Sequence, residues 1–329
     1  MASKRVIFQA LFLVVAVATL ASTVSQVTIK EWGVPTPHSR PHDPAVAPDG
    51  SLWYTAQMAN KLGRLDPKTG QFKEYPLKTP DSGPHGLTAD RDGNIWFTAI
   101  FKGYVGKLNP RNGEIAEYRP SGAEIDPHTP VFDQHGILWF TTQESNLIGR
   151  LDPQSGEIKL AKVPTARAVP YGIVVAKSGV PYFCEFGSNK LASIDPNSLA
   201  ITEYPLPSSD ARPRRLALAS DGSIYYTDYE RGYLGHFDPT TKQVEEWASP
   251  GGSNSNPYGI TVTPDGTVWY AESGIKPNKL VRFDPKTKKF ASTAVPSGGG
   301  VIRNMAATPD GKVYIACSGV DKVGIAEVD

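Results

Sequence analysis

Short apolar and aromatic runs recur along the chain, and each of them follows a turn glycine. Residues 52–56 (LWYTA) follow Gly50, and residues 95–99 (IWFTA) follow Gly93. The spacing between successive turn glycines is 43 to 45 residues, and such a constant period is typical of repeat architectures. The seven turn glycines are Gly50, Gly93, Gly136, Gly179, Gly222, Gly266 and Gly311.

Each repeat predicts four short strands. An apolar run before the turn glycine gives the first strand, and the aromatic run after it gives the second. The third strand contains sequences such as residues 62–65 (LGRL), and it ends in a turn that begins Asp66-Pro67. The fourth strand follows as residues 72–76 (FKEYP). Seven four-stranded units predict an all-β fold, a seven-bladed β-propeller.

The two ends of the chain are expected to complete one blade together. The last repeat stops after its third strand, residues 322–328 (KVGIAEV). A fourth-strand pattern without a repeat of its own lies near the start, at residues 27–35. We therefore predict that this N-terminal strand closes the last blade and covers its open edge.

Residues 1–25 have the features of a signal peptide. Lys4 and Arg5 precede an apolar run at residues 6–20, and small residues place a cleavage site near Ala18 to Ser25. The run has 15 residues, whereas a membrane span needs about 20. We expect export to the periplasm or the cell exterior, with no integral membrane domain after cleavage; an uncleaved N-terminal anchor is the alternative. Residues 26–329 are predicted to form a single domain that acts as a monomer.

Composition excludes several classes of protein. Lys and Arg number 34 and Asp and Glu 33, so the net charge of +1 lacks the basic footprint of a nucleic-acid binder. Two cysteines rule out a disulfide scaffold or a zinc ribbon. Cys184 and Cys317 are expected on blades four and seven, too far apart to form a disulfide, so both should be free.

Seven residues occupy one equivalent position, eight residues before each turn glycine. All but the last follow a proline, and we expect them in the loops before the first strands, around the mouth of a central channel where propeller ligands bind. Packing alone could also explain the recurrence. These column residues are His42, His85, His128, Tyr171, Arg214, Tyr258 and Arg303. A second column, expected after the second strands, is Ala56, Ala99, Thr142, Glu185, Asp228, Glu272 and Cys317, whose carboxylates could pair with the arginines.

The repeats resemble the virginiamycin B lyase (streptogramin B lyase) family over residues 27–329. The resemblance rests on units such as residues 84–88 (PHGLT) with 93–98 (GNIWFT), and residues 147–151 (LIGRL) with 203–207 (EYPLP). It implies a seven-bladed propeller that opens a cyclic depsipeptide by elimination, using Mg²⁺ and a histidine. The family's active positions fall here on Tyr258, Val301, Arg303 and Ser318, which lack the family's histidines and glutamates.

The same constellation recurs three blades away on this ring. Asp126-Pro127-His128 repeats the acidic-Pro-His triplet, and Glu144 follows the second strand of the same blade. The resemblance then implies His128 as general base, His85 as the group that orients or protonates the leaving oxygen, and Asp126 and Glu144 as Mg²⁺ ligands. The substrate-binding residues would be His42, Tyr171, Arg214, Tyr258 and Arg303.

Three functions remain open at this point. The first is an exported lyase that opens a cyclic ester or depsipeptide with Mg²⁺. The second is a non-catalytic propeller of the cell envelope that binds a small molecule or peptide through its His, Tyr and Arg rim. A metal-dependent lactonase is a minor third, because Glu272 and Asn304 offer few ligands to a central metal. No Gly-x-Ser-x-Gly elbow or dinucleotide fingerprint supports other enzyme chemistry.

Overall fold

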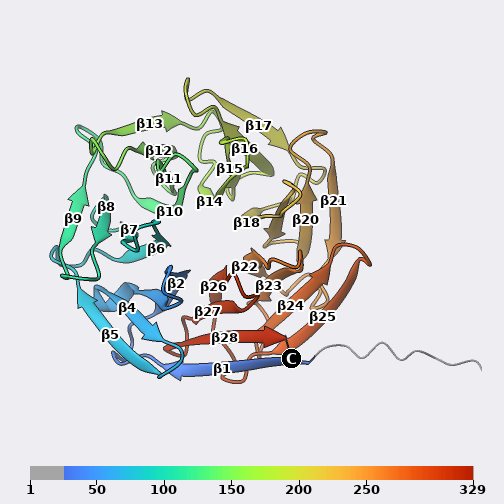
Figure 1. Ribbon diagram of the computed structural model, residues 1–329. Helices are drawn as coiled ribbons and strands as arrows, with labels where there is room; N and C mark the ends of the chain where they lie inside the picture. The colour runs from blue at the N-terminus through green and yellow to red at the C-terminus, as the bar shows by residue number, and fades with distance from the viewer. Residues whose placement is uncertain (1–25, 329) are drawn as a thin grey trace, which may run out of the picture.

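The structure, a computed structural model, describes residues 26–328 as seven four-stranded antiparallel sheets set in a ring (Figure 1). The predicted signal peptide, residues 1–25, lies outside the described residues. Blades one to three are β2 (Pro41–Val46), β3 (Leu52–Ala56), β4 (Lys61–Asp66) and β5 (Gln71–Pro76); β6 (Pro84–Ala89), β7 (Ile95–Ala99), β8 (Tyr104–Leu108) and β9 (Ile115–Tyr118); and β10 (Pro127–Phe132), β11 (Leu138–Thr142), β12 (Leu147–Leu151) and β13 (Ile158–Lys162).

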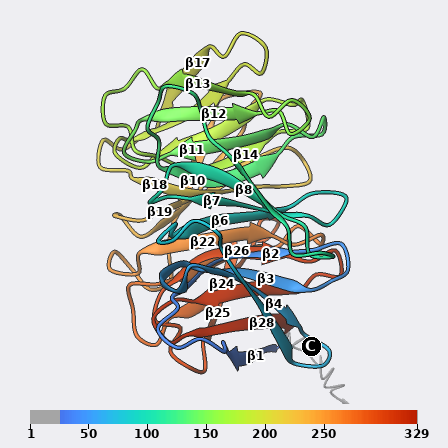
Figure 2. The ribbon, with the colours of Figure 1, turned by 90° about the vertical axis from the view of Figure 1, so that its left-hand side faces the viewer.

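The remaining blades repeat this order, with the first strand of each nearest the axis and the fourth at the rim (Figures 1 and 2). They are β14 (Pro170–Val175), β15 (Pro181–Glu185), β16 (Lys190–Ile194) and β17 (Ile201–Pro205); β18 (Pro213–Leu218), β19 (Ile224–Asp228), β20 (Tyr233–Phe237) and β21 (Val244–Ala248); β22 (Pro257–Val262), β23 (Val268–Glu272), β24 (Lys279–Asp284) and β25 (Lys289–Ala294); and β26 (Ile302–Ala307), β27 (Val313–Cys317) and β28 (Lys322–Val328) with β1 (Val27–Gly33). A short 3-10 helix, η1 (Gln57–Ala59), follows β3. The prediction of an all-β seven-bladed propeller is confirmed. None of the helices in the described part of the chain has the length and apolar character that crossing a membrane requires.

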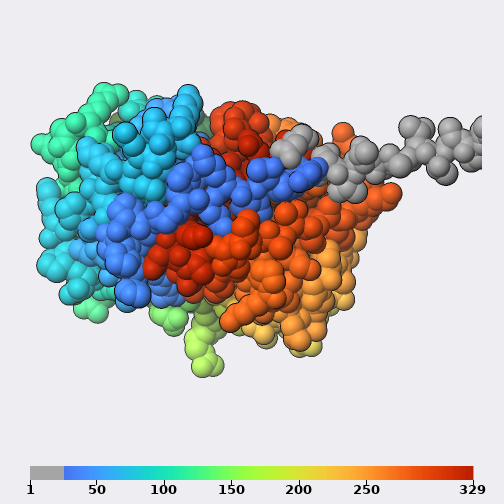
Figure 3. Space-filling view, turned by 90° about the horizontal axis from the view of Figure 1, so that it is seen from below, coloured from blue at the N-terminus to red at the C-terminus, as the bar shows by residue number. Residues whose placement is uncertain are grey.

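The ring closes as the sequence predicts. Strand β1 pairs antiparallel with β28, from Val27 opposite Val328 to Gly33 opposite Lys322, so the sheet order of blade seven is β1-β28-β27-β26. In Figure 3 the blue N-terminal segment lies against the red surface of the last blade. Both ends of the described chain are therefore held in one sheet, and β28 has a partner strand on each side.

A glycine in the third strand of most blades has a packing reason. The ring of Tyr54 lies over Gly63, where an added Cβ would be 2.0 Å from the ring, and Phe97 covers Gly106 in the same way. Such a contact leaves no room for a side chain, because protein interiors are close-packed. These third-strand glycines therefore mark the positions that pair with a large aromatic residue of the second strand.

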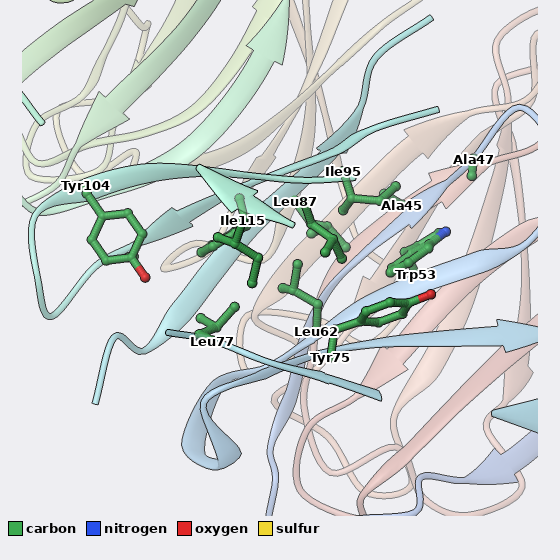
Figure 4. Close-up of a cluster of buried hydrophobic side chains, with 13 residues drawn as sticks. Ala45, Ala47, Trp53, Leu62, Tyr75, Leu77, Leu87, Ile95, Tyr104 and Ile115 are labelled. Atoms are coloured by element: carbon green, nitrogen blue, oxygen red, sulfur yellow. The ribbon is translucent and has the colours of Figure 1, made fainter. Parts of the chain in front are cut away.

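Apolar side chains from adjacent blades fill the spaces between the sheets. Trp53 and Tyr75 of blade one pack with Leu87 and Ile95 of blade two in one cluster (Figure 4). Trp53 is 1% exposed and Ile95 is fully buried. Each blade therefore buries its apolar face only against its neighbours, which makes stability depend on the complete ring.

Candidate functional site at the ring axis

The column residues lie inside the innermost strands rather than in the loops before them. His42 is the second residue of β2 and Tyr258 the second residue of β22. The expectation of a loop position was wrong, because pairing resumes beyond an irregularity: Pro41 pairs with Ala56 after a register shift. For the same reason the second column ends the second strand instead of following it. We call the face on which inner strands begin and second strands end the mouth face.

Side chains of the second strands fix the backbone of the column. Thr98 Oγ1 accepts a hydrogen bond from the Gly86 amide at 2.8 Å and donates one to the carbonyl of His128, on the next blade, at 2.7 Å. This satisfies backbone groups that the register shift removes from the ladder. The residues that connect neighbouring blades in this way are Thr55, Thr98, Thr141, Cys184 and Thr227. Cys184 and Cys317 are both free, as predicted.

The three histidines of blades one to three form a stack that we call the histidine arc. Ring centroids are 3.8 Å apart for His42 and His85 and 3.9 Å apart for His85 and His128. The stack continues to Tyr171 at 4.0 Å from His128. These imidazoles, distant in sequence, are thus neighbours around one axis. Their exposed fractions are only 2%, 5% and 0%.

Burial keeps the histidine arc neutral. It holds the pKa of His42, His85 and His128 well below the usual value of 6.5. Nearby arginines lower these pKa values further, above all Arg303 on His42, whereas Asp43 raises the pKa of His85. His42 Nδ1 lies 2.8 Å from an Asp43 carboxylate oxygen, and His128 Nδ1 lies 2.8 Å from Thr129 Oγ1. Neutral imidazoles of this kind can act as acceptors, but they have little contact with the surface.

The column residues of blades four to seven, Tyr171, Arg214, Tyr258 and Arg303, form what we call the arginine arc. The Arg214 guanidinium lies 3.8 Å from the ring centroid of Tyr258 and 4.2 Å from that of Tyr229. The hydroxyl groups of Tyr171 and Tyr258 are hydrogen-bonded to each other. Burial alone would raise the pKa of Tyr258, but Arg214, Arg215 and Arg303 outweigh it and lower the pKa below 10.

A cleft of about 360 Å³ opens beside the arginine arc on the mouth face. Asp321 shapes one wall, because its carboxylate accepts the His38 amide at 2.7 Å and the Arg40 amide at 3.1 Å. Burial and the charge of Arg303 lower the pKa of Arg40, so the two guanidinium groups are close enough to repel each other. We call this the mouth cleft; it is lined by His38, Arg40, Val301, Arg303, Ser318, Gly319 and Asp321.

The carboxylates of the second column are engaged away from the arginines of the mouth. Asp228 pairs with Arg231 at 2.6 Å, Glu272 accepts hydrogen bonds from Ser249 and the Gly251 amide, and Glu185 accepts one from Ser188. Among residues 26–328, the side chains of Arg40, Arg214 and Arg303 form no ion pair. These three guanidinium groups therefore have no ion-pair partner, although the Asp321 carboxylate lines the same cleft and accepts backbone amides there.

Sequence reasoning missed a polar layer directly below the column. The Arg215 guanidinium crosses the axis and lies 3.0 Å from Asp43 and 3.1 Å from Thr129, while the Asn304 amide donates to Asp43 at 3.0 Å. The signal was available, because these residues stand seven before their turn glycines. Glycines occupy that position on blades two, four and six; at Gly86 an added Cβ would be 2.1 Å from the His128 carbonyl oxygen.

Of the two residues predicted to hold Mg²⁺, Asp126 instead binds the backbone of the loop that contains Glu144. One oxygen of Asp126 accepts the Glu144 amide at 2.6 Å, and the other accepts the Ser145 amide at 2.9 Å and the Ser145 hydroxyl at 2.5 Å. The side chain of Glu144 is exposed. Mg²⁺ requires several converging oxygen ligands, so this arrangement does not fit a preformed site. The metal roles of Asp126 and Glu144, and the Mg²⁺ itself, stay predictions.

A second group of ligand types lies in the histidine arc. In the described part of the chain, His42, Asp43 and His85 offer ligand atoms within 4.8 Å of one another. However, Asp43 already accepts hydrogen bonds from Arg215 and Asn304, and the surrounding guanidinium groups oppose a further positive charge. The electrostatics of the axis therefore favour an anion over a metal ion.

The comparisons with known proteins agree with the geometry of the ring. Residues 10–274 match the Virginiamycin B lyase family. The chain belongs to this family. It is similar to a streptogramin B lyase structure at 26% identity and a TM-score of 0.85, with 92% of this chain and 98% of that one covered.

Two further solved structures share the fold of this family member. One is selenomethionine-substituted virginiamycin B lyase from Staphylococcus aureus, with 24% identity and a TM-score of 0.84. The other is a catalytically inactive variant of the Staphylococcus aureus enzyme with quinupristin, with 22% identity and a TM-score of 0.84. Each match covers 92% of this chain and 100% of the other. No curated protein sequence matches the chain.

Proposed function

We propose that this member of the virginiamycin B lyase family binds an anionic small molecule in the mouth cleft. The observation that supports the proposal is that Arg40 and Arg303 line one cleft and that neither they nor Arg214 form an ion pair among residues 26–328. The Asp321 carboxylate also lines the cleft, but it accepts the backbone amides of His38 and Arg40. Partly buried charges without partners are costly, so a bound anion would stabilise the arrangement. A carboxylate suits it best, because a guanidinium group can bind one through two parallel hydrogen bonds.

Two polar atoms of the arginines lack an internal hydrogen-bond partner. The Nε atoms of Arg214 and Arg303 are buried and have no hydrogen-bond partner among the described residues. Arg214 is held in place by four aromatic rings, those of Tyr171, Phe186, Tyr229 and Tyr258, at 3.8 to 5.0 Å. Stacking of this kind orients a guanidinium group without consuming its charge, which leaves the charge to act on a ligand.

Elimination remains the second candidate, and membership of the family favours it. A streptogramin lyase acts on a cyclic depsipeptide, and the histidine arc supplies neutral imidazoles that could accept a proton. Against it, His128 is fully buried and His85 is 5% exposed, whereas a general base must come within hydrogen-bond distance of its substrate. We therefore place binding before catalysis.

The binding proposal is tested by calorimetric titration of the purified chain with acetate, succinate and inorganic phosphate, using acetamide as the neutral probe. We expect the anions to bind and acetamide not to bind. Arg303→Gln and Arg40→Gln should each weaken anion binding at least about tenfold. Arg111→Gln, a change of an exposed arginine in a rim turn away from the cleft, serves as control. Equal anion affinities in all three variants would contradict the proposal.

The elimination candidate needs a separate experiment. Quinupristin is incubated with the chain, with and without Mg²⁺, and the products are separated by chromatography and weighed by mass spectrometry. Elimination opens the ring at unchanged mass but shifts the retention time, whereas hydrolysis adds the mass of one water. Under the binding proposal the compound is recovered unchanged. Turnover that requires Mg²⁺ and is lost in His128→Ala would instead establish the lyase with its predicted base.

A further inference from the structure

Two large apolar side chains are exposed beside the mouth cleft. Among residues 26–328, the large hydrophobic side chains that are exposed are Met58 at 59%, Phe101 at 57% and Val328 at 44%. Val328 ends β28, the third strand of blade seven. Met58 and Phe101 instead lie in the loops between the second and third strands of blades one and two, which are on the mouth face.

Backbone contacts place Met58 next to the cleft and Phe101 on the neighbouring blade. The Met58 amide donates to the carbonyl of Ser39 at 3.0 Å, which places Met58 beside Arg40. The Phe101 amide donates to the carbonyl of Ser82 at 3.1 Å. The ring of Phe101 covers Gly83, where an added Cβ would be 2.2 Å from the ring.

The two loops both contact the start of blade two. Helix η1, which contains Met58, lies against β6, the strand that begins directly after Gly83. Met58 and Phe101 therefore border the same short stretch of blade two, and we call this pair the apolar strip. It continues from the Arg40 wall of the mouth cleft onto the next blade. A cationic cleft thus passes directly into an exposed apolar surface.

We infer that the ligand is an amphiphilic carboxylate, with its anionic group in the mouth cleft and its apolar part on the apolar strip. This inference rests on the proposed anion-binding function and adds the second half of the ligand to it. Exposed apolar side chains cost little singly, but next to an unpaired cationic cleft they match a molecule that carries both characters. Burial of each methylene group on such a surface increases affinity by up to about fourfold.

The arrangement also explains why neither half is sufficient. Acetate can reach the guanidinium groups but leaves the apolar strip in water, and a neutral alcohol covers the strip but leaves the charges of Arg40 and Arg303 uncompensated. The structure therefore predicts that affinity rises with chain length only when the carboxylate is present. A protein partner that docked on Met58 and Phe101 would show no such coupling to the arginines.

The test is a titration of the full chain with acetate, hexanoate and decanoate, below the concentration at which decanoate forms micelles, and with hexanol as the neutral probe. We expect affinity to rise at least about tenfold from acetate to decanoate. The double variant Met58→Ser/Phe101→Ser should lose that gain and bind acetate as before. Val328→Ser, which changes the exposed apolar residue at the end of β28, is the matched control and should retain the gain. Thermal unfolding checks that each variant folds.

The outcomes separate this inference from the function on which it rests. If acetate binds but chain length has no effect, the apolar strip is not part of the site and the inference fails alone. If the decanoate gain survives in the double variant, the apolar part of the ligand lies elsewhere and the inference fails as well. If no carboxylate binds to the native chain, the proposed function itself is wrong.

Discussion

The histidine arc and the arginine arc occupy the same backbone position on different blades, yet the first is neutral and the second is positively charged. In the histidine arc, His42, His85 and His128 stack as buried neutral rings. In the arginine arc, Arg214 and Arg303 retain their charge beside a cleft. The propeller therefore fixes the backbone position of the seven side chains. The residue type at each position decides whether that part of the ring is neutral or charged.

The second column divides along the same line. It contributes Ala56, Ala99 and Thr142 next to the histidine arc but Glu185, Asp228 and Glu272 on blades four to six. These carboxylates bind groups of nearby turns and loops and not the mouth arginines. Acidic residues near arginines in sequence columns are thus no evidence of ion pairs, because neighbouring columns of a blade can point to different partners.

The two arcs meet only because the ring is closed, so removing the closing strand should have the largest effect. Deletion of residues 27–33 exposes one side of β28 and removes seven paired positions from blade seven. We expect the loss of cooperative folding, measured by circular dichroism on heating. Lys30→Gln, a change of one exposed residue in the same strand, should leave the melting temperature almost unchanged. A deletion variant that melts like the native chain would show that closure does not hold the arcs together.

A smaller but still large effect is expected at the contact that joins the arcs below the column. Arg215 of blade five reaches Asp43 of blade one, and both are almost completely buried. Arg215→Leu leaves the Asp43 carboxylate buried without its cation, and the free energy of unfolding should fall by about 3–5 kcal/mol. The double variant Arg215→Leu/Asp43→Asn removes the stranded charge and should recover part of the loss. Urea unfolding measures the stability of both variants. Equal stability of the single variant and the native chain would show that the contact between Arg215 and Asp43 does not stabilise the ring.

The difference in charge between the arcs should appear in the pH dependence of stability. The pKa of His85 is lowered by burial, then by the neighbouring His42, so the folded state takes up its proton less readily than the unfolded state. The contribution of neutral His85 to the free energy of unfolding is complete above about pH 6.5, and it is lost as the pH falls towards the lowered pKa of the folded state. His85→Phe should reduce the loss of stability between pH 7 and pH 5 by up to about 2 kcal/mol. Parallel pH profiles of urea unfolding for both proteins would contradict this.

The period of 43 to 45 residues was sufficient to predict the blades, the closure and the grouping of three histidines, because a repeat fixes which residues are equivalent. It was not sufficient to place the column inside the strands, since a register shift such as that between Pro41 and Pro44 has no clear sequence mark. The Arg40 wall of the cleft depends on Asp321, 281 residues away. The Asp126 carboxylate shows the same limit: spacing suggested a metal ligand, but only the structure shows its hydrogen bonds to the Glu144 and Ser145 amides.

The smallest effect should distinguish the second columns of the two arcs. Burial raises the pKa of Glu185 to about 7, although Ser188 donates a hydrogen bond that favours the charged form. A folded-state pKa above the unfolded value of 4.5 means that the protonated form is favoured by folding, so this contribution is present below pH 4.5 and is lost as the pH rises through 7. Glu185→Gln cannot ionise, so its stability relative to the native chain should increase between pH 5 and pH 8, by up to about 2 kcal/mol. Thr142→Val, at the equivalent position beside the histidine arc, should change stability equally at both pH values. Calorimetric melting at pH 5 and 8 decides the matter, since a Glu185→Gln effect that does not vary with pH would mean that the two columns differ in packing alone.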